Sequence, residues 1–314
     1  MAFPTETVYG LGGNALLAES ARKIYRVKGR PSDNPLIVHI CRLEEAREVG
    51  GSIPQDFYRL AEAFWPGPLT MIVGKKACIP DSVTGGLDTV AIRMPSHPAA
   101  RRLIELAGCP VAAPSANLSG GVSPTMAKHV IDDLDGKIDY IIDGGNAAYG
   151  LESTVISLAG DKPVILRPGS VTYSMIQRIL PEAELHESLT GSVQKMEGRP
   201  ASPGMKYKHY SPKAEVYLVY GEPEQVAGFM RRQDGEDCCM FLYDGQPAQG
   251  LRHTYSLGSP EDLSQSASRV FAYLRDADEK GYRKIYIPAV PETGIGLALM
   301  NRLKKAAAGK CVRL

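Results

Sequence analysis

Apolar residues in the first half of the chain fall into short runs that alternate with stretches of helical period. Short apolar runs bounded by Gly, Pro or polar residues predict strands, while apolar positions three and four residues apart predict helices. Several strands follow one another with no helix between them, which favours a mixed sheet. Strands are predicted at 35–40, 69–73, 89–94, 111–113, 140–143, 153–158 and 163–167, and helices at 19–27, 55–64, 98–107, 125–134 and 173–180.

A smaller alternating pattern occupies the end of the chain. Strands are predicted there at 215–220, 238–243, 254–257 and 284–288, with a short closing strand, and helices at 224–232, 260–279 and 295–308. Strands separated by helical crossovers predict a small three-layer domain of Rossmann-like type. The fold class is therefore α/β: a twisted mixed sheet with flanking helices in residues 1–186, followed by the smaller Rossmann-like domain in residues 214–314.

Residues 187–213 join the two patterns. They are polar, contain Gly, Pro and Ser, and have no period, which is typical of a long connection. From residue 191 onward the segment carries five Lys or Arg and one acid, Glu197, so its local charge is +4 (five minus one) in a chain of net charge +1. Segments of this length are active-site lids or plain linkers, and the residues alone leave both interpretations open.

Composition excludes several classes of protein. A hydrophobic content of 44% and a charged content of 23% exclude disordered and fibrous chains. No apolar run reaches the ~18 residues of a membrane span and no signal peptide opens the chain, so a cytoplasmic protein without membrane contact is expected. The six cysteines never form C-x-x-C, which predicts reduced thiols rather than disulfides or zinc ligands. The net charge of +1 argues against a surface dominated by nucleic-acid backbone binding.

The first candidate site is a glycine-rich segment near the start of the chain. Gly10 to Ala15 matches the dinucleotide-binding pattern G-x-G-x-x-A, and Asp33 follows about 20 residues later. That pattern requires a strand before it and a helix directly after it. Here a hydroxyl-rich segment, Pro4 to Thr7, precedes it, and the helix is predicted to begin only at about residue 18. We therefore reject a nicotinamide site.

Cations at element ends are the second candidate. Lys28 and Arg30 follow a predicted helix and can clamp a polyphosphate, or they can simply offset the helix dipole, which is the favoured interpretation for this segment alone. His39 on the next strand is more typical of a packed histidine than of a ligand. Arg93 ends an apolar strand and needs an anionic partner. That partner is a ligand carboxylate or, more commonly, a distant Asp or Glu.

Loops rich in hydroxyls and glycine follow two of the strands. Such loops can supply hydroxyl, amide and main-chain N–H donors to phosphates and sugars. They equally form ordinary turns and caps. The residues of interest in these segments are Ser115, Asn117, Ser119 and Ser123, with Ser153 and Arg167 at the ends of later strands.

Taken together, these segments resemble one known family. The chain contains, in order, PTETVYGLG, KGRPxxNPLIVH, WPGPLT, TVAIRMP, APSAN, SPT, ESTV and ILRPG, which resemble the threonylcarbamoyl-AMP synthase family. The segments SPGMKYKHYSP and GIGLALMNRLKKAA are similar to the linker and last helix of its two-domain Sua5 form. The resemblance implies a YrdC-like catalytic domain in 1–186, an active-site lid in 187–213 and a Sua5-type domain in 214–314. It also implies that the catalytic domain lacks the strand and helix that precede the first motif in the family.

The resemblance implies an L-threonylcarbamoyladenylate synthase. Such an enzyme converts L-threonine, bicarbonate and ATP to threonylcarbamoyl-AMP, pyrophosphate and water, for threonylcarbamoyladenosine in tRNA. ATP is then a substrate, and Mg²⁺ is expected with it, held mostly by phosphates and water rather than by protein ligands. The product would pass to the tRNA threonylcarbamoyl transferase complex, with at most weak contact to tRNA itself.

The family's site residues can be carried over motif by motif. The threonine pocket falls on Thr7, His39, Arg93, Ala113 and Ser153. The nucleotide site falls on Lys28, Arg30, Asn34, Thr89, Ser115, Asn117, Ser123, Arg167 and, from the linker, Ser202. Arg93 would then bind the carboxylate of the amino acid. Lys28, Arg30 and Arg167 are the expected catalytic residues, which neutralise phosphate charge rather than exchange protons.

Two other functions remain as alternatives. One is a non-catalytic RNA-binding module, although the near-neutral charge and the absence of interleaved basic and aromatic residues argue against it. The other is an enzyme with the same fold that transfers a carbamoyl group from a different donor. Pyrophosphate release that depends on both threonine and bicarbonate separates the three.

A carbamate and its mixed anhydride with AMP both decompose in water, so the site should close during the reaction. We predict that residues 202–210 fold across the groove and become ordered when nucleotide binds. Limited proteolysis checks this prediction: cleavage within 202–210 should slow when ATP and L-threonine are added together. Equal cleavage with and without the two substrates would contradict it.

Overall fold

The structure is a computed structural model, and it describes residues 1–190, 209–246 and 248–314. The described residues form two compact units. One contains residues 1–119 and 123–190, and the other contains residues 120–122, 209–246 and 248–314. Within these ranges, no helix combines the length and the apolar composition needed to cross a membrane.

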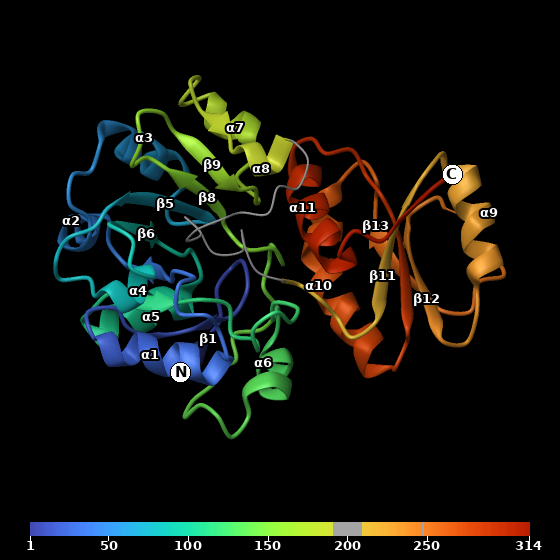
Figure 1. The fold of residues 1–314 in the computed structure, drawn as a ribbon, viewed down its shortest axis with the longest axis horizontal. Helices are drawn as coiled ribbons and strands as arrows, with labels where there is room; N and C mark the ends of the chain where they lie inside the picture. Colours follow the sequence, from blue (N-terminus) through green and yellow to red (C-terminus); the bar gives the residue numbers. More distant parts are fainter. Residues whose placement is uncertain (191–208, 247) are drawn as a thin grey trace. The chain divides into compact units, whose positions relative to one another are not determined.

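An eight-stranded sheet forms the centre of the first unit (Figure 1). Its strands lie side by side in the order β10 (Glu184–Leu185), β9 (Val164–Arg167), β8 (Thr154–Ser157), β5 (Leu69–Gly74), β6 (Thr89–Arg93), β4 (Ile37–His39), β7 (Val111–Ala113) and β3 (Gly13–Asn14). Three neighbouring pairs are parallel (β10/β9, β8/β5 and β6/β4) and the other four are antiparallel. The prediction of a mixed sheet is confirmed. Beside this sheet, β1 (Ala2–Phe3) and β2 (Gly10–Leu11) form a separate antiparallel pair.

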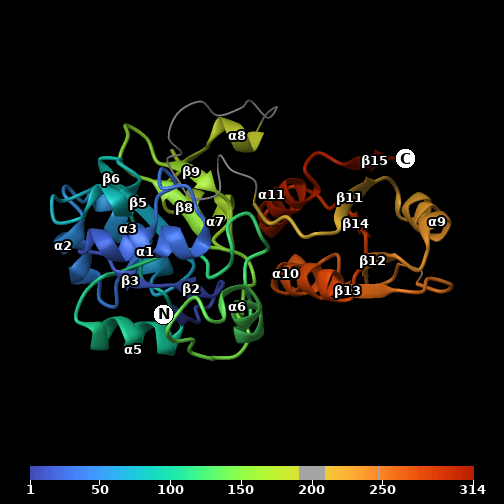
Figure 2. The same cartoon turned by 60° about the horizontal axis from the view of Figure 1, so that its bottom comes forward.

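Helices and short helical turns surround this sheet. They are α1 (Ala18–Lys28), a 3-10 turn (Leu43–Glu45), α2 (Ala46–Val49), α3 (Gln55–Phe64), α4 (Asp81–Thr84), α5 (Pro98–Ala107), α6 (Ala127–Leu134), α7 (Tyr173–Gln177) and α8 (Glu187–Thr190). Helix α1 packs beside β3 and α4, and its full length is seen in Figure 2. It ends at Gly29, whose left-handed backbone (φ 63°) returns its N–H to the carbonyl of Arg26. That ending places Lys28 in the last turn and Arg30 in the segment that leads to β4.

Alternate residues of the central strands build two layers of apolar packing. Val38, Met71 and Ile92 belong to the main core, together with Phe57 and Leu60 of α3. Burying side chains of this size contributes about 1.5–3 kcal/mol each. The intervening strand residues form a smaller cluster of Ile37, Ile72, Ala91, Val155 and Leu166. Because successive residues of a strand point to opposite faces, this smaller cluster lies on the other face of the sheet.

The second unit is a three-layer α/β domain. Its five strands are all parallel and lie in the order β13 (Thr254–Gly258), β12 (Cys238–Tyr243), β14 (Lys284–Pro288), β11 (Glu215–Tyr220) and β15 (Cys311–Arg313). One face carries α9 (Pro223–Gln233), and the other carries α10 (Leu263–Glu279) and α11 (Ile295–Ala307), which pack against each other (Figure 1). The prediction of a smaller Rossmann-like unit is confirmed.

One predicted strand is wrong. Residues 140–143 form no strand, and only Ile141 makes an isolated bridge, to Ala2. The bridge is closed by hydrogen bonds from the N–H of Ala2 to Tyr140 O (2.8 Å) and from the N–H of Ile142 to Ala2 O (3.0 Å). Pairing ends there because β1 has only two residues. The shortest elements, including β1, β2, β3 and α4, were not predicted, since two to four residues cannot display a period.

The glycine-rich segment has a packing role. Its first glycine lies in β2 and Gly13 in β3, and α1 begins only at Ala18, so no glycine stands at a strand-to-helix turn. A Cβ atom on Gly12 would lie 2.7 Å from a ring carbon of Phe3 and 2.8 Å from Cγ1 of Val111. Phe3 and Val111 belong to one buried cluster, so the close approach of the chain at this position requires glycine.

Gly12→Ala should therefore destabilise the first unit, by about 1–3 kcal/mol, because the added methyl overpacks Phe3 and Val111. Gly74→Ala is a matched control, since a Cβ on Gly74 would meet nothing within 4 Å. Urea denaturation followed by the fluorescence of Trp65, the chain's single tryptophan, measures both variants. Equal midpoints for Gly12→Ala and the wild type would contradict the packing role.

Candidate functional site

A row of buried side chains crosses one face of the sheet in the first unit. Strand pairing sets His39 of β4 opposite Arg93 of β6, and Arg93 opposite Thr70 of β5. Thr70 in turn lies opposite Val155 of β8. Paired residues point to the same face, so the register aligns these side chains. The face is that of the smaller apolar cluster, which contains Val155.

Arg93 is held by three hydrogen bonds. Its Nη2 donates to Oε1 of Glu6 at 2.6 Å, its Nη1 to Oγ1 of Thr7 at 2.9 Å, and its Nε to the carbonyl of Gly67 at 3.3 Å. The two charged side chains are only 4% and 6% exposed, which makes this a buried ion pair. Of the two partners considered for Arg93, the distant acid is therefore present. Sequence reasoning missed Glu6, although it stands between two threonines of the PTETVYG motif.

The Glu6 carboxyl is ionised at neutral pH. Burial raises its pKa, but the charge of Arg93, the hydrogen bond from it and the nearby main-chain N–H groups of Glu6 and Ser96 together outweigh burial, so the pKa is lowered overall. Its second oxygen, Oε2, is buried and has no hydrogen-bond partner among the described residues. Breaking one half of a buried ion pair is costly, because the remaining charge is left uncompensated.

His39 is a buried, neutral imidazole beside this pair. Burial first, and then the charge of Arg93, lower its pKa to about 3. Its Nδ1 lies 3.1 Å from the carbonyl of Ile37. A carbonyl can only accept, so Nδ1 carries the proton of the neutral ring. The carbonyls of Ile37 and Val111 both raise the pKa of the ring, but burial and Arg93 outweigh them. Phe3 packs edge-on against the ring, with the centroids 6.2 Å apart.

A second group of polar side chains continues from Thr70. Its Oγ1 lies 2.7 Å from Oγ of Ser153. Arg167, at the end of β9, donates from Nη2 to the same Oγ at 3.2 Å and from Nε to the Ser153 carbonyl at 3.0 Å. All three residues are buried. The structure thus brings Ser153 and Arg167 together, and it adds Thr70, which the WPGPLT motif contained but sequence reasoning did not select.

Lys28 joins α1 to the loop after β7. Its Nζ donates to the carbonyls of Ser115 and Asn117 and lies 3.5 Å from Oδ1 of Asn117. The N–H of Ser119 returns a bond of 2.9 Å to the Lys28 carbonyl. Lys28 is only 3% exposed. These hydrogen bonds therefore hold the KGRP and APSAN motifs together, although they are almost 90 residues apart in the sequence.

The remaining predicted nucleotide residues lie on nearby turns and strands. Arg30 donates from Nε to the carbonyl of Asn34 (3.3 Å) and from Nη2 to that of Pro35 (3.1 Å). Oδ1 of Asn34 is buried without a partner in the described part of the chain. Ser123 donates to the carboxylate of Glu152, a further acid that sequence reasoning missed.

Three predicted residues are not tied into these groups. Thr89 opens β6 opposite Gly74, and Ala113 is a buried residue of β7 opposite Ile37. Ser202 lies outside the described residues, as does most of the predicted lid. Residues 1–190, 209–246 and 248–314 contain no group of three or more His, Cys, Asp or Glu that could hold a metal ion.

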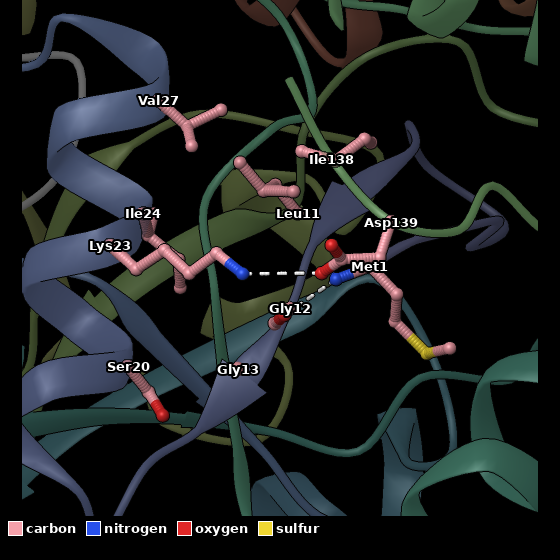
Figure 3. A pocket seen from close by; sticks show the side chains of 10 residues that line it. All are labelled: Met1, Leu11, Gly12, Gly13, Ser20, Lys23, Ile24, Val27, Ile138 and Asp139. Atoms are coloured by element: carbon pink, nitrogen blue, oxygen red, sulfur yellow. Dashed lines mark hydrogen bonds and ion pairs between the residues drawn. The ribbon is translucent and has the colours of Figure 1, made fainter. Parts of the chain in front are cut away.

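A pocket of about 160 Å³ beside α1 contains none of the predicted site residues (Figure 3). Its wall includes the apolar side chains of Leu11, Ile24 and Ile138. The ion pair between Lys23 and Asp139, 3.2 Å apart, stands at its edge. Because none of the predicted site residues lines this pocket, the candidate site is the polar row on the sheet.

Known proteins and family models match this chain over almost its whole length. A family model described as "Telomere recombination" matches residues 1–169, and one described as "Threonylcarbamoyl-AMP synthase, C-terminal domain" matches residues 171–308. Threonylcarbamoyl-AMP synthase of Bacillus subtilis (strain 168) is 45% identical over 320 residues, which cover 100% of this chain and 90% of the relative. The protein of the same name from Pyrococcus abyssi (strain GE5 / Orsay) is 44% identical, with 100% and 92% covered.

The chain belongs to the threonylcarbamoyl-AMP synthase family. The crystal structure of P. abyssi Sua5 complexed with L-threonine matches the fold with a TM-score of 0.89 at 42% identity, and the match covers 100% of this chain and 92% of that one. The family predicted from the ordered motifs is confirmed. The site residues that the family resemblance implies in the first unit lie mainly in three places: in the polar row, around Lys28 and around Arg30.

The neutral state of His39 predicts how stability depends on pH. A pKa lowered from 6.5 to about 3 means that, between these values, the unfolded chain binds a proton that the folded chain does not. His39 therefore contributes stability that is present above pH 6.5 and is lost as the pH falls. From about pH 7.5 to about pH 5 the wild type should lose about 2 kcal/mol through this residue.

His39→Gln should remove that part of the pH dependence, while His186→Gln, which alters a less buried histidine, should leave it in place. Denaturation followed by Trp65 fluorescence at both pH values measures the difference. A loss in His39→Gln as large as that in the wild type would show that His39 is protonated in the folded protein.

Proposed function

We propose that this protein is an L-threonylcarbamoyladenylate synthase that converts L-threonine, bicarbonate and ATP to threonylcarbamoyl-AMP, pyrophosphate and water. The observation that carries the proposal is the full-length similarity to two-domain relatives that bear this name, one of which is crystallised with L-threonine. The polar row on the sheet supports it, because it gathers cationic and hydroxyl groups that suit an amino acid.

The proposed threonine pocket consists of Thr7, His39, Arg93, Ala113 and Ser153. The strand register supports this assignment, since His39 and Arg93 are direct neighbours and Thr7 is hydrogen-bonded to Arg93. Arg93 would bind the substrate carboxylate even though it is paired with Glu6, because a guanidinium has five N–H groups and the three bonds described above use one each. The neutral His39 adds no second positive charge beside it.

The proposed nucleotide site consists of Lys28, Arg30, Asn34, Thr89, Ser115, Asn117, Ser123, Arg167 and Ser202. Main-chain carbonyls fix the positions of the first two cations, and a carbonyl and a hydroxyl fix that of Arg167. Preorganised cations of this kind stabilise the charge that develops on phosphate during transfer. Mg²⁺ would accompany the nucleotide and supply further charge neutralisation at the phosphates.

The proposed chemistry needs no protein nucleophile. Bicarbonate takes up a proton and loses water to give carbon dioxide, and the ammonium group of threonine loses a proton to give the nucleophilic amine. The amine attacks carbon dioxide and loses a second proton, which gives the carbamate. A carbamate oxygen then attacks the α-phosphorus of ATP, and pyrophosphate leaves. The protein holds the reactants in position, neutralises the phosphates and excludes water. The product would then pass, in the cytoplasm, to the tRNA threonylcarbamoyl transferase complex.

Pyrophosphate release tests the proposed function. With the full-length protein and ATP, release should require L-threonine and bicarbonate together, because neither alone generates the carbamate nucleophile. Turnover without threonine would indicate a different carbamoyl chemistry. No turnover with all three substrates would favour the non-catalytic RNA-binding alternative.

Lys28→Met should reduce the rate of this reaction by about 100-fold or more, since it removes a preorganised charge from the phosphate site. Lys162→Met is a suitable control, because Lys162 forms an exposed ion pair with Glu184 and belongs to no proposed site. Equal rates for the two variants would remove Lys28 from the catalytic residues.

A further inference from the structure

Glu6 has two oxygens in different surroundings. Oε1 accepts the 2.6 Å hydrogen bond from Arg93. Oε2 is equally buried but has no hydrogen-bond partner among the described residues. An ionised oxygen that is buried without a hydrogen-bond donor is unfavourable, because it has lost the hydrogen bonds that water gives to an exposed carboxylate. Glu6 belongs to none of the residue sets assigned above.

Arg93 has N–H groups that make no hydrogen bond to the described residues. Its three hydrogen bonds use one N–H on each of its three nitrogens. A guanidinium carries two N–H groups on each terminal nitrogen. Among the described residues, one N–H on Nη1 and one on Nη2 are therefore available. The buried pair thus has donors on Arg93 and an acceptor on Glu6 that make no hydrogen bond to the described residues.

An α-amino acid carries the complementary pair of charges, an ammonium and a carboxylate on the same carbon atom. We propose that Glu6 binds the ammonium group of the amino-acid substrate through Oε2, while Arg93 binds its carboxylate. The inference rests on the proposed function, in which L-threonine is the substrate. The zwitterion is neutral overall, so it adds no uncompensated charge to the buried pair.

The backbone around Glu6 is held in place. The side chain of Thr5 accepts hydrogen bonds from the N–H groups of Thr7 and Val8, both at 3.2 Å. The carbonyl of Glu6 accepts from the N–H of Tyr149 at 2.8 Å. A carboxylate fixed in this way can orient an amine without further ordering of the chain. In the proposed complex, Glu6 contacts the substrate and does more than position Arg93.

Binding measurements with an analogue that lacks the amine separate these two roles. R-3-hydroxybutanoate has the carboxylate and the hydroxyl of L-threonine but no ammonium group. Calorimetric titration of the full-length wild type should give a dissociation constant about 10- to 100-fold lower for L-threonine than for the analogue, the value of a buried charge-assisted hydrogen bond. Glu6→Gln should reduce this preference to about threefold or less.

Glu6→Gln keeps a carbonyl oxygen that can accept from Arg93, but it removes the whole carboxylate charge and leaves Arg93 without its ionic partner. Both ligands carry a carboxylate and experience the change at Arg93, whereas only L-threonine loses a contact to its ammonium group. Glu45→Gln is the matched control. Glu45 is also a buried acid, but both of its oxygens have protein partners, Oε1 with Arg42 and Oε2 with the N–H of Cys41. The preference for L-threonine should be unchanged in this variant.

Equal weakening of both ligands by Glu6→Gln, with the preference retained, would overturn the inference and leave Glu6 as a positioning residue for Arg93. If Glu6→Gln does not fold, equal affinity of the wild type for the two ligands would still overturn the inference, because it would exclude a bound ammonium. Glu6→Asp, which keeps the charge but shortens the side chain, then replaces Glu6→Gln, and an unchanged preference for L-threonine in this variant would likewise overturn the inference. These outcomes leave the proposed function intact. A wild type that binds neither ligand and releases no pyrophosphate would instead contradict the proposed function itself.

Discussion

The buried ion pair between Glu6 and Arg93 is the interaction on which the candidate site depends. It ties the loop after β1 to the end of β6, and through Thr7 it reaches the hydroxyls of the first motif. Removing either partner would leave a charge with almost no access to water, which costs several kcal/mol. Burial first, and then the charge of Arg93, keep the neighbouring His39 neutral, while the charge of Glu6 acts in the opposite direction. Arg93 therefore helps to keep Glu6 ionised and adds to the effect of burial that keeps His39 neutral.

Strand register supplies the geometry around that pair. His39, Arg93 and Thr70 come from three strands, and their alignment follows from pairings that are parallel on one side of β6 and antiparallel on the other. A shift of one residue in any of these strands would turn its polar side chain into the main core. The apolar residues that alternate with the polar ones prevent such a shift. Core packing and site assembly are therefore consequences of the same register.

The cations proposed to bind phosphate are organised differently. Lys28, Arg30 and Arg167 lie at the ends of elements and donate to carbonyls of neighbouring turns. Such bonds hold the side chains in position before a ligand arrives, which reduces the entropy lost on binding. The left-handed ending of α1 at Gly29 determines where the first two cations stand. A local backbone feature thus sets the position of charged groups that a distant loop then fixes.

The sequence by itself determined the longer elements, the mixed and parallel character of the two sheets, and the family. Periodicity is local, so helices such as α3 and strands such as β5 and β12 can be read from it, and ordered motifs identify a family without any contact being known. It could not determine the partner of Arg93, because Glu6 lies 87 residues away and no local pattern joins them. It likewise missed the two-residue strands, the roles of Thr70 and Glu152, and the single bridge at Ile141, which it read as a strand. These features depend on contacts between distant segments, and only the tertiary structure decides such contacts.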